Sequence, residues 1–269
     1  MQKPFIIVRG AGDLATGTIH RLWSAGFPVL ALEAAHPAAI RRQVALSEAV
    51  YEGTASVEDV TAQRIDSPDQ LSKVLERGRV PLLVDPEGKC IPELKPAAVV
   101  DAILAKRNLG TTRNMAPLTI GLGPGFTAGA DVDYVVETMR GHNLGRVIRE
   151  GAARPNTGIP GAIGGYAAER VLHAAQAGVL YNVRAIGDFV EQGETIAVIR
   201  NGEGEHPVPA TITGLIRGLI RDGFPVTEGF KIADIDPRKT EYKNCFTISD
   251  KARCIAGSVL ELVCRYTLG

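Results

Sequence analysis

The stretch from residue 5 to residue 22 constrains the fold of this chain more than any other. An apolar run ending at Val8 leads into Gly10-x-Gly12-x-x-Ala15 and then into residues of helical character. This order is typical of a buried strand, a tight turn and the start of a helix that holds a pyrophosphate. Gly10 permits the turn, Gly12 lets backbone amides approach a phosphate, and Ala15 lets the helix pack closely on the strand.

The residues around this turn extend the predicted cofactor site. A second apolar run, 28–32, ends at Glu33, where an acid usually binds the ribose hydroxyls. Thr16 lies in the same turn, and Asp13 places a carboxylate where a pyrophosphate would lie. Either Asp13 caps the helix and pairs with Arg9, or the loop holds a different anion or an ion.

The choice of cofactor stays open at this point. Glu33 argues against a ligand with a 2′-phosphate, whereas Arg41 and Arg42 would favour one. The sequence therefore predicts a dinucleotide ligand without deciding between its phosphorylated and unphosphorylated forms.

A second glycine-rich loop follows another apolar run, at residues 117–126. Gly123, Gly125 and Thr127 have backbone amides and a hydroxyl that suit a substrate or cofactor, or they form only a tight turn that requires glycine. A helix is predicted at 69–77. Alternating strands and helices predict a Rossmann-like α/β domain with a parallel, doubly wound sheet, whose ligand lies at the carboxyl ends of the strands.

Composition excludes several classes of function. The chain has 269 residues and a formal net charge of zero, so no basic surface attracts nucleic acid or an anionic membrane. No apolar run approaches the ~20 residues of a membrane span, and no signal peptide precedes the first strand. We therefore expect a cytoplasmic protein. The four cysteines are widely spaced, which predicts free thiols and no metal site, with Cys90 the best placed for catalysis.

The chain repeats itself in its second half. The pattern of Gly187 to Ile199 recurs 36 positions later at Gly223 to Ile235, and each copy predicts a short strand, a glycine turn and a longer strand. This pattern resembles the biotinyl/lipoyl family of β barrel-sandwich domains. That family carries its attachment lysine at a hairpin tip, but the tip here, 200–206, has no lysine. We therefore expect no covalent biotin or lipoate.

These features predict three regions. A Rossmann-like nucleotide-binding domain spans 1–165, a biotinyl/lipoyl-like β module spans 166–240, and a C-terminal helical segment, 241–269, packs back. Residues 150–165 contain five glycines and two prolines and form either a linker or a binding loop. No nucleophile or general base is evident, so the sequence leaves open whether the protein is an enzyme.

Five stretches together resemble the YqeB-type family over nearly the whole chain. They are Ile7–Gly17, Arg41–Gly53, Val84-Asp85-Pro86, Gly121–Phe126 and Ile232–Arg238. The family is named as a component of the selenium-dependent molybdenum hydroxylase system. The resemblance therefore implies an accessory protein that matures a molybdenum hydroxylase partner, with a molybdopterin-type ligand as the alternative to a dinucleotide (NAD-like) one. A homo-oligomer is also expected.

A second function remains open from the residues alone. The glycine loop and Glu33 are equally compatible with an NAD-dependent oxidoreductase of a small metabolite. A shared fold does not decide between the two functions.

Overall fold

The protein is described here by a computed structural model covering residues 3–156, 158 and 163–268. It divides into two compact units, and each is described by itself. The first unit comprises Met1–Pro37, Ala45–Thr157 and Ile248–Gly269, and the second comprises Ala38–Val44 and Gly158–Thr247.

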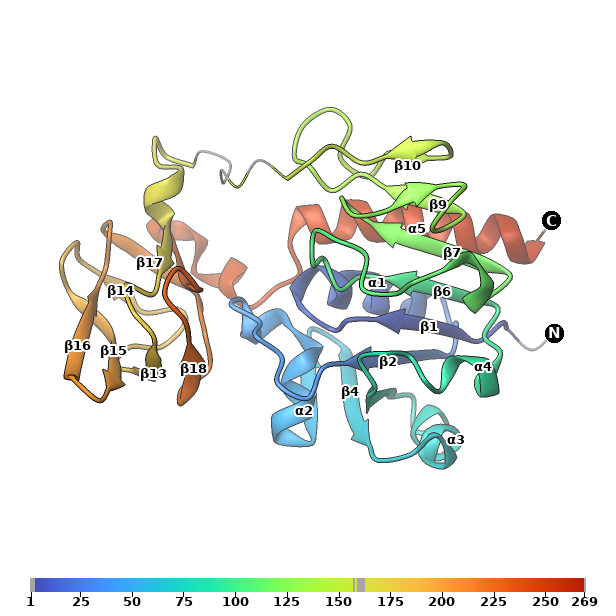
Figure 1. Ribbon diagram of the computed structural model, residues 1–269, viewed down its shortest axis with the longest axis horizontal. Coiled ribbons are helices and arrows are strands. Elements are labelled where there is room, and N and C mark those ends of the chain that lie inside the picture. Colours follow the sequence, from blue (N-terminus) through green and yellow to red (C-terminus); the bar gives the residue numbers. More distant parts are fainter. Residues whose placement is uncertain (1–2, 157, 159–162, 269) are drawn as a thin grey trace. The chain divides into compact units, whose positions relative to one another are not determined.

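The described part of the first unit is built on a nine-stranded sheet in the order β10-β9-β7-β6-β1-β2-β5-β4-β3 (Figure 1). Its strands are β1 (Ile6–Arg9), β2 (Val29–Glu33), β3 (Thr54–Val57), β4 (Val60–Ile65), β5 (Val80–Val84), β6 (Ala98–Asp101), β7 (Leu118–Leu122), β9 (Tyr134–Val136) and β10 (Val147–Ile148). A separate pair joins β8 (Thr127–Ala128) to β11 (Gly151–Ala152). The central strands are almost wholly buried, which suits strands covered on both faces.

Two long helices pack together in this unit, α1 (Asp13–Ser24) and α5 (Asp250–Leu268). They approach closely at Gly17, where an added Cβ would lie 2.7 Å from the Cβ of Ala252. The Ser249 hydroxyl accepts a hydrogen bond from the Ala252 amide at 3.2 Å, so a side-chain cap begins α5.

The remaining helices of the first unit are short. They are α2 (Ala49–Glu52), α3 (Leu71–Leu75) and α4 (Ile91–Leu94), with 3-10 turns η2 (Leu46–Glu48), η3 (Pro68–Gln70) and η4 (Arg113–Met115). The helix predicted over 69–77 is thus divided between η3 and α3.

The prediction of a parallel, doubly wound sheet is wrong for the first unit. The sheet is mixed, because β3 pairs antiparallel with β4 and β10 pairs antiparallel with β9. The described residues between β6 and β7 form only the 3-10 turn η4 and no α-helix. Apolar runs and glycines identify strands, but they do not fix the direction of the edge strands or the length of the connecting helices.

The described part of the second unit consists mainly of two four-stranded antiparallel sheets, in the orders β12-β19-β17-β14 and β16-β15-β13-β18. The strands are β12 (Val171–His173), β13 (Gly178–Asn182), β14 (Phe189–Val190), β15 (Thr195–Asn201), β16 (Gly204–Pro209), β17 (Gly214–Leu219), β18 (Phe224–Val226) and β19 (Lys231–Asp236). The 3-10 turns are η1 (Arg42–Val44), η5 (Ala168–Arg170) and η6 (Lys239–Cys245).

The internal repeat is confirmed as a structural repeat. Its first copy forms β14 and β15 and its second forms β18 and β19, with each pair joined by a turn at a glycine of positive φ. The two copies exchange sheets, because β14 and β19 lie in one sheet and β15 and β18 lie in the other. Leu180, Ile196, Ile216 and Ile232 are fully buried in the core of this unit.

Candidate functional site

The candidate site lies where the strand order of the first sheet reverses. From β1 the chain continues to β2 on one side, whereas β6 pairs with β1 on the other side and leads to β7. In open α/β sheets, ligands bind outside the carboxyl ends of the strands at this kind of reversal. The last residues of β1 and β6, Arg9 and Asp101, lie opposite each other in the register.

Gly10 is required by the fold. Its φ is +96°, and an added Cβ would lie 2.8 Å from the backbone oxygen of Ala102, directly after β6. Its amide donates to the Leu32 carbonyl at 2.7 Å. The prediction that Gly10 permits a tight turn is therefore confirmed.

Gly12 differs from Gly10 in both its backbone conformation and its surroundings. It is the N-cap residue of α1, with a φ of −65° that any residue adopts, and no side chain caps the helix there. An added Cβ would meet no described atom within 4 Å. The space beside Gly12 at the start of α1 is thus open to a ligand, so its predicted role stays a prediction that the geometry permits.

Thr16 has a structural task in this loop. Its hydroxyl donates to the Ala11 carbonyl at 3.2 Å and accepts from the Leu46 amide at 2.9 Å. The Ser47 amide donates to the same Ala11 carbonyl at 2.8 Å. The Ser47 hydroxyl beside it is buried and has no hydrogen-bond partner among the described residues. These bonds fix the glycine loop against residues 46–47.

Glu33 also contacts the glycine loop. Its carboxylate accepts the Ala11 amide at 2.7 Å and the Ala34 amide at 2.8 Å. Burial raises the pKa of Glu33, although the two amides act in the opposite direction. In this state the carboxylate binds the loop's own backbone, and its predicted role with ribose hydroxyls stays a prediction.

Arg9 and Asp101 form a buried ion pair at the strand reversal, which sequence reasoning missed. Arg9 Nη1 lies 3.7 Å from Asp101 Oδ2, and both residues are 1% exposed. The Thr111 hydroxyl joins them: it donates to Asp101 at 2.5 Å and accepts from Arg9. Arg9 therefore pairs with Asp101 and not with Asp13. Charged residues at the ends of two buried strands were the available signal.

Asp13 lies near a lysine of α5. Burial lowers the pKa of Lys251, and the carboxylates of Asp13 and Glu137 act in the opposite direction. Glu137 is itself committed, because it accepts the amides of Thr138, Met139 and Arg154. The start of α1 is thus a mixed-charge environment with one half-buried ammonium group.

The second glycine loop is packed more tightly than the first. A Cβ on Gly123 would lie 2.6 Å from the Thr138 hydroxyl, and a Cβ on Gly125 would lie 2.7 Å from the Cα of Arg107. Thr127 is exposed, and its amide donates to Asp131 at 2.7 Å. The two glycines therefore allow close packing, and the ligand role predicted for all three residues stays a prediction.

Residues 102–111 fill the space between the two loops. Gly10 packs against Ala102 at one end, and Gly125 packs against Arg107 near the other. Leu104 and Lys106 have φ values of 60° and 63°, which are rare for residues with a side chain. Such strained backbone often occurs beside functional sites.

Cys90 is unsuited to nucleophilic catalysis. Burial, followed by the neighbouring Asp85, raises the pKa of its thiol to about 12. The thiolate, which is the reactive form, is therefore negligible at neutral pH.

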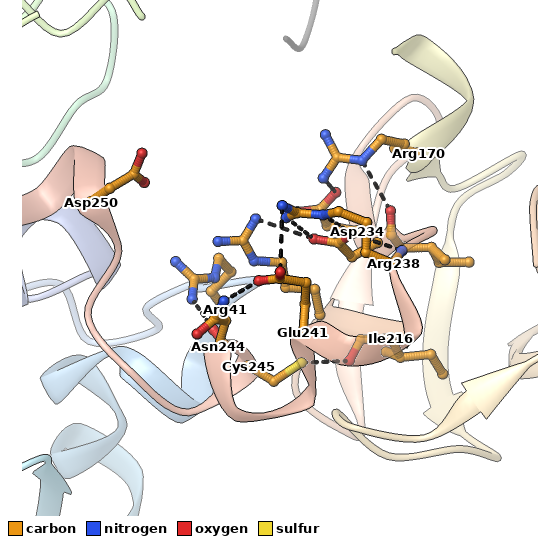
Figure 2. Close-up of polar contacts among 12 residues, drawn as sticks. Arg41, Arg170, Ile216, Asp234, Arg238, Glu241, Asn244, Cys245 and Asp250 are labelled. Atoms are coloured by element: carbon orange, nitrogen blue, oxygen red, sulfur yellow. Dashed lines mark hydrogen bonds and ion pairs between the residues drawn. The ribbon is translucent and has the colours of Figure 1, made fainter. Parts of the chain in front are cut away.

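The second unit holds a charged cluster along β19, drawn in Figure 2. Arg170 Nη2 donates to Asp234 at 3.2 Å, and Arg238 forms a bidentate pair with Asp236 at 2.9 and 2.7 Å. Hydrogen bonds and charges from Arg238 hold the pKa of Asp236 low against the effect of burial. Asp234 and Asp236 belong to the strand itself, whereas Arg238 follows it.

An open hollow of about 490 Å³ lies at the amino ends of two strands of the first sheet. Its lining includes Pro117 and Asp133, which precede β7 and β9, whereas the glycine loops follow β1 and β7. Arg113 and Asp133, also in the lining, pair at 2.8 Å. The hollow is thus separate from the predicted binding residues.

No helix in the described residues is long and apolar enough to cross a membrane.

Comparison with known proteins adds one clear relative. No family model matches this chain. It is 51% identical over 256 residues, or 95% of its length, to the uncharacterized protein YqeB of Escherichia coli K12, and the two are homologous. The chain spans only 46% of the length of that relative. The expected likeness to YqeB is therefore confirmed.

Several solved structures are similar at low identity. The apo ectoine utilization protein EutE (DoeB) from Ruegeria pomeroyi has a TM-score of 0.28 and 10% identity, with 87% of this chain and 86% of that chain covered. A succinylglutamate desuccinylase/aspartoacylase from Rhodobacter sphaeroides has a TM-score of 0.30 and 12% identity, with 88% and 86% covered. We transfer no substrate or reaction from them.

These comparisons correct the predicted fold class and function. The similar structures are ectoine utilization and aspartoacylase/desuccinylase proteins, and they are not Rossmann-like proteins joined to a lipoyl-like module. Neither are they molybdenum hydroxylase accessory proteins or NAD-dependent oxidoreductases. Both predicted functions, with the selenium-dependent role, are contradicted. The predicted hydroxylase partner and homo-oligomer stay predictions.

Proposed function

We propose that the first unit binds a phosphate-bearing small molecule at the start of α1. Gly12 carries this proposal, because its conformation and its surroundings would accommodate a larger residue and yet a glycine is present. A glycine at an open helix start lets a phosphate approach the backbone amides. The proposal concerns binding and specifies no reaction.

Two features beside the loop support the proposal. The hydroxyl of Ser47, buried beside Ala11, has no hydrogen-bond partner among the residues described. Glu33 accepts the Ala11 amide, so its carboxylate lies beside the loop. There it could also accept hydrogen bonds from the neighbouring hydroxyls of a ligand. A dinucleotide (NAD-like) or a molybdopterin-type phosphate ester meets these requirements.

Titration calorimetry with NAD, NADP and a molybdopterin-type ligand tests this proposal. We expect one of them to bind the protein and Gly12→Val to weaken that binding at least about 100-fold, because the added side chain would occupy the phosphate position. Gly257→Val is the matched control, since Gly257 also has open surroundings but lies on the exposed side of α5. Unchanged affinity in the Gly12 variant would exclude this loop as the site.

A further inference from the structure

Three potential metal ligands meet outside the glycine-loop site. His20 of α1 lies beside Glu58 and Asp59, which connect β3 to β4. The ligand atoms of the three residues all lie within 4.8 Å of one another. Both carboxylates approach the same imidazole nitrogen, with His20 Nε2 2.6 Å from Asp59 Oδ1 and 3.9 Å from Glu58 Oε2.

The turn that carries the two acids departs from the usual chemistry of tight hairpins. Val57 pairs with Val60, so Glu58 and Asp59 form the whole two-residue loop. Glu58 has a φ of +54°, a conformation for which glycine or asparagine is preferred. The left-handed conformation is unfavourable for a residue with a side chain. Two consecutive acids are thus held beside His20 at an energetic cost.

Glu58 is oriented from behind by Arg253 of α5 and by Ile248, which precedes that helix. Its Oε1 accepts the Ile248 amide at 2.9 Å and Arg253 Nη2 at 2.6 Å. The other oxygen, Oε2, is 2.9 Å from Arg253 and is the one nearest His20. Hydrogen bonds of this kind orient the ligands of metal sites, and Oε2, which accepts one of them, keeps a second lone pair for the ion.

We infer that His20, Glu58 and Asp59 bind a divalent transition-metal ion of the zinc class. One imidazole and two carboxylates suit zinc and similar ions better than magnesium or calcium, which prefer all-oxygen sites. Metal–ligand distances of about 2.0–2.2 Å in a tetrahedral site place ligand atoms roughly 3.3 Å apart. The His20–Asp59 contact would lengthen by about 0.7 Å, and the His20–Glu58 contact would shorten by about 0.6 Å.

The ion would join three parts of the first unit: α1, the β3–β4 turn and, through Glu58, the start of α5. The side chains of His20 and Glu58 are 16% and 20% exposed, whereas that of Asp59 is 70% exposed. Water can therefore reach the ion and complete its coordination. No spacing motif indicates this site, because the imidazole and the carboxylates are 38 and 39 positions apart in the sequence.

Cobalt(II) and zinc(II) titrations test the inference without any assumption about the glycine loops. They use the full chain with Cys254→Ser, so that this exposed thiol does not compete. We expect saturable binding, a Co²⁺ absorption spectrum without thiolate charge transfer, and a higher melting temperature with Zn²⁺. His20→Ala and Asp59→Asn should each weaken binding by more than about 100-fold, whereas His36→Ala should leave it unchanged.

The exposed Asp59 keeps the test decisive if the His20 variant unfolds, because Asp59→Asn removes a ligand and leaves the packing intact. Arg253→Gln gives an independent readout, since it removes a cation from Glu58 and should change the affinity while the three ligands remain. An absence of saturable binding below about 1 mM metal would overturn the site. Equal affinity in the parent and Asp59→Asn would do the same.

Discussion

The two glycine loops on either side of β6 differ in what their glycines do. In the second loop, Thr138 packs against Gly123 and Arg107 packs against Gly125, so close packing alone accounts for both glycines. The first loop contains one glycine of that kind, Gly10, and one that the fold does not need, Gly12. Packing and backbone conformation therefore account for Gly10, Gly123 and Gly125, and Gly12 is left for the proposed ligand to explain.

The segment between the loops depends on the buried pair of Arg9 and Asp101, and breaking that pair should have the largest effect. Asp101→Ala would leave the Arg9 guanidinium buried without a carboxylate, so we expect the free energy of unfolding to fall by about 3–5 kcal/mol. Glu261→Ala on α5 is the control, because its partner Arg265 is 58% exposed and such pairs contribute about 1 kcal/mol or less.

Chemical denaturation followed by circular dichroism measures both variants. A cost for Asp101→Ala no larger than that for Glu261→Ala would show that Thr111 and the backbone carbonyl of Pro86 suffice to hold Arg9. The segment from 102 to 111 would then not depend on the ion pair.

The contrast between the two loops predicts that the same substitution, glycine to alanine, lowers stability in the second loop and leaves it nearly unchanged at Gly12. Gly125→Ala places a Cβ against the backbone of Arg107 at a φ of +112°, so we expect a loss of roughly 2–4 kcal/mol of stability. Gly12→Ala adds a Cβ in open space at an ordinary φ, and its stability should stay within about 0.5 kcal/mol of the parent. Thermal melts of the two variants compare them directly, and equal losses would remove the distinction between the loops.

Local sequence patterns predicted the elements that depend on nearby residues. The strand, tight turn and helix at the N-terminus and the internal repeat all follow from spacing within a short window. Residues 171–173 form β12, which pairs with β19 more than 50 positions away, and no local spacing predicts that pairing. Long-range pairing overrides local propensity there.

The candidate site shows the same limit. Gly10 forms the turn and Glu33 contacts the loop, as the motif implies. The hydroxyl of Thr16, however, is hydrogen-bonded to the backbone of Ala11 and Leu46. The Arg9–Asp101–Thr111 network joins residues 102 positions apart. No spacing rule connects them, because the register of two parallel strands brings them together.

Glu33 offers the finest test of the comparison, because this half-buried carboxylate accepts the Ala11 amide of the first loop. Burial raises the folded-state pKa of Glu33 above its unfolded value. Its contribution to stability is therefore fully present below the unfolded pKa and is lost as the pH rises through the folded pKa. We expect the difference in unfolding free energy between the parent and Glu33→Gln to decline as the pH rises from about 4 towards neutrality. Urea unfolding of both proteins across that range measures the decline. A difference that grows with pH would show that the hydrogen bonds from the Ala11 and Ala34 amides lower the pKa of Glu33 more than burial raises it. The carboxylate beside the first loop would then be ionised and ready to accept hydrogen bonds from a ligand.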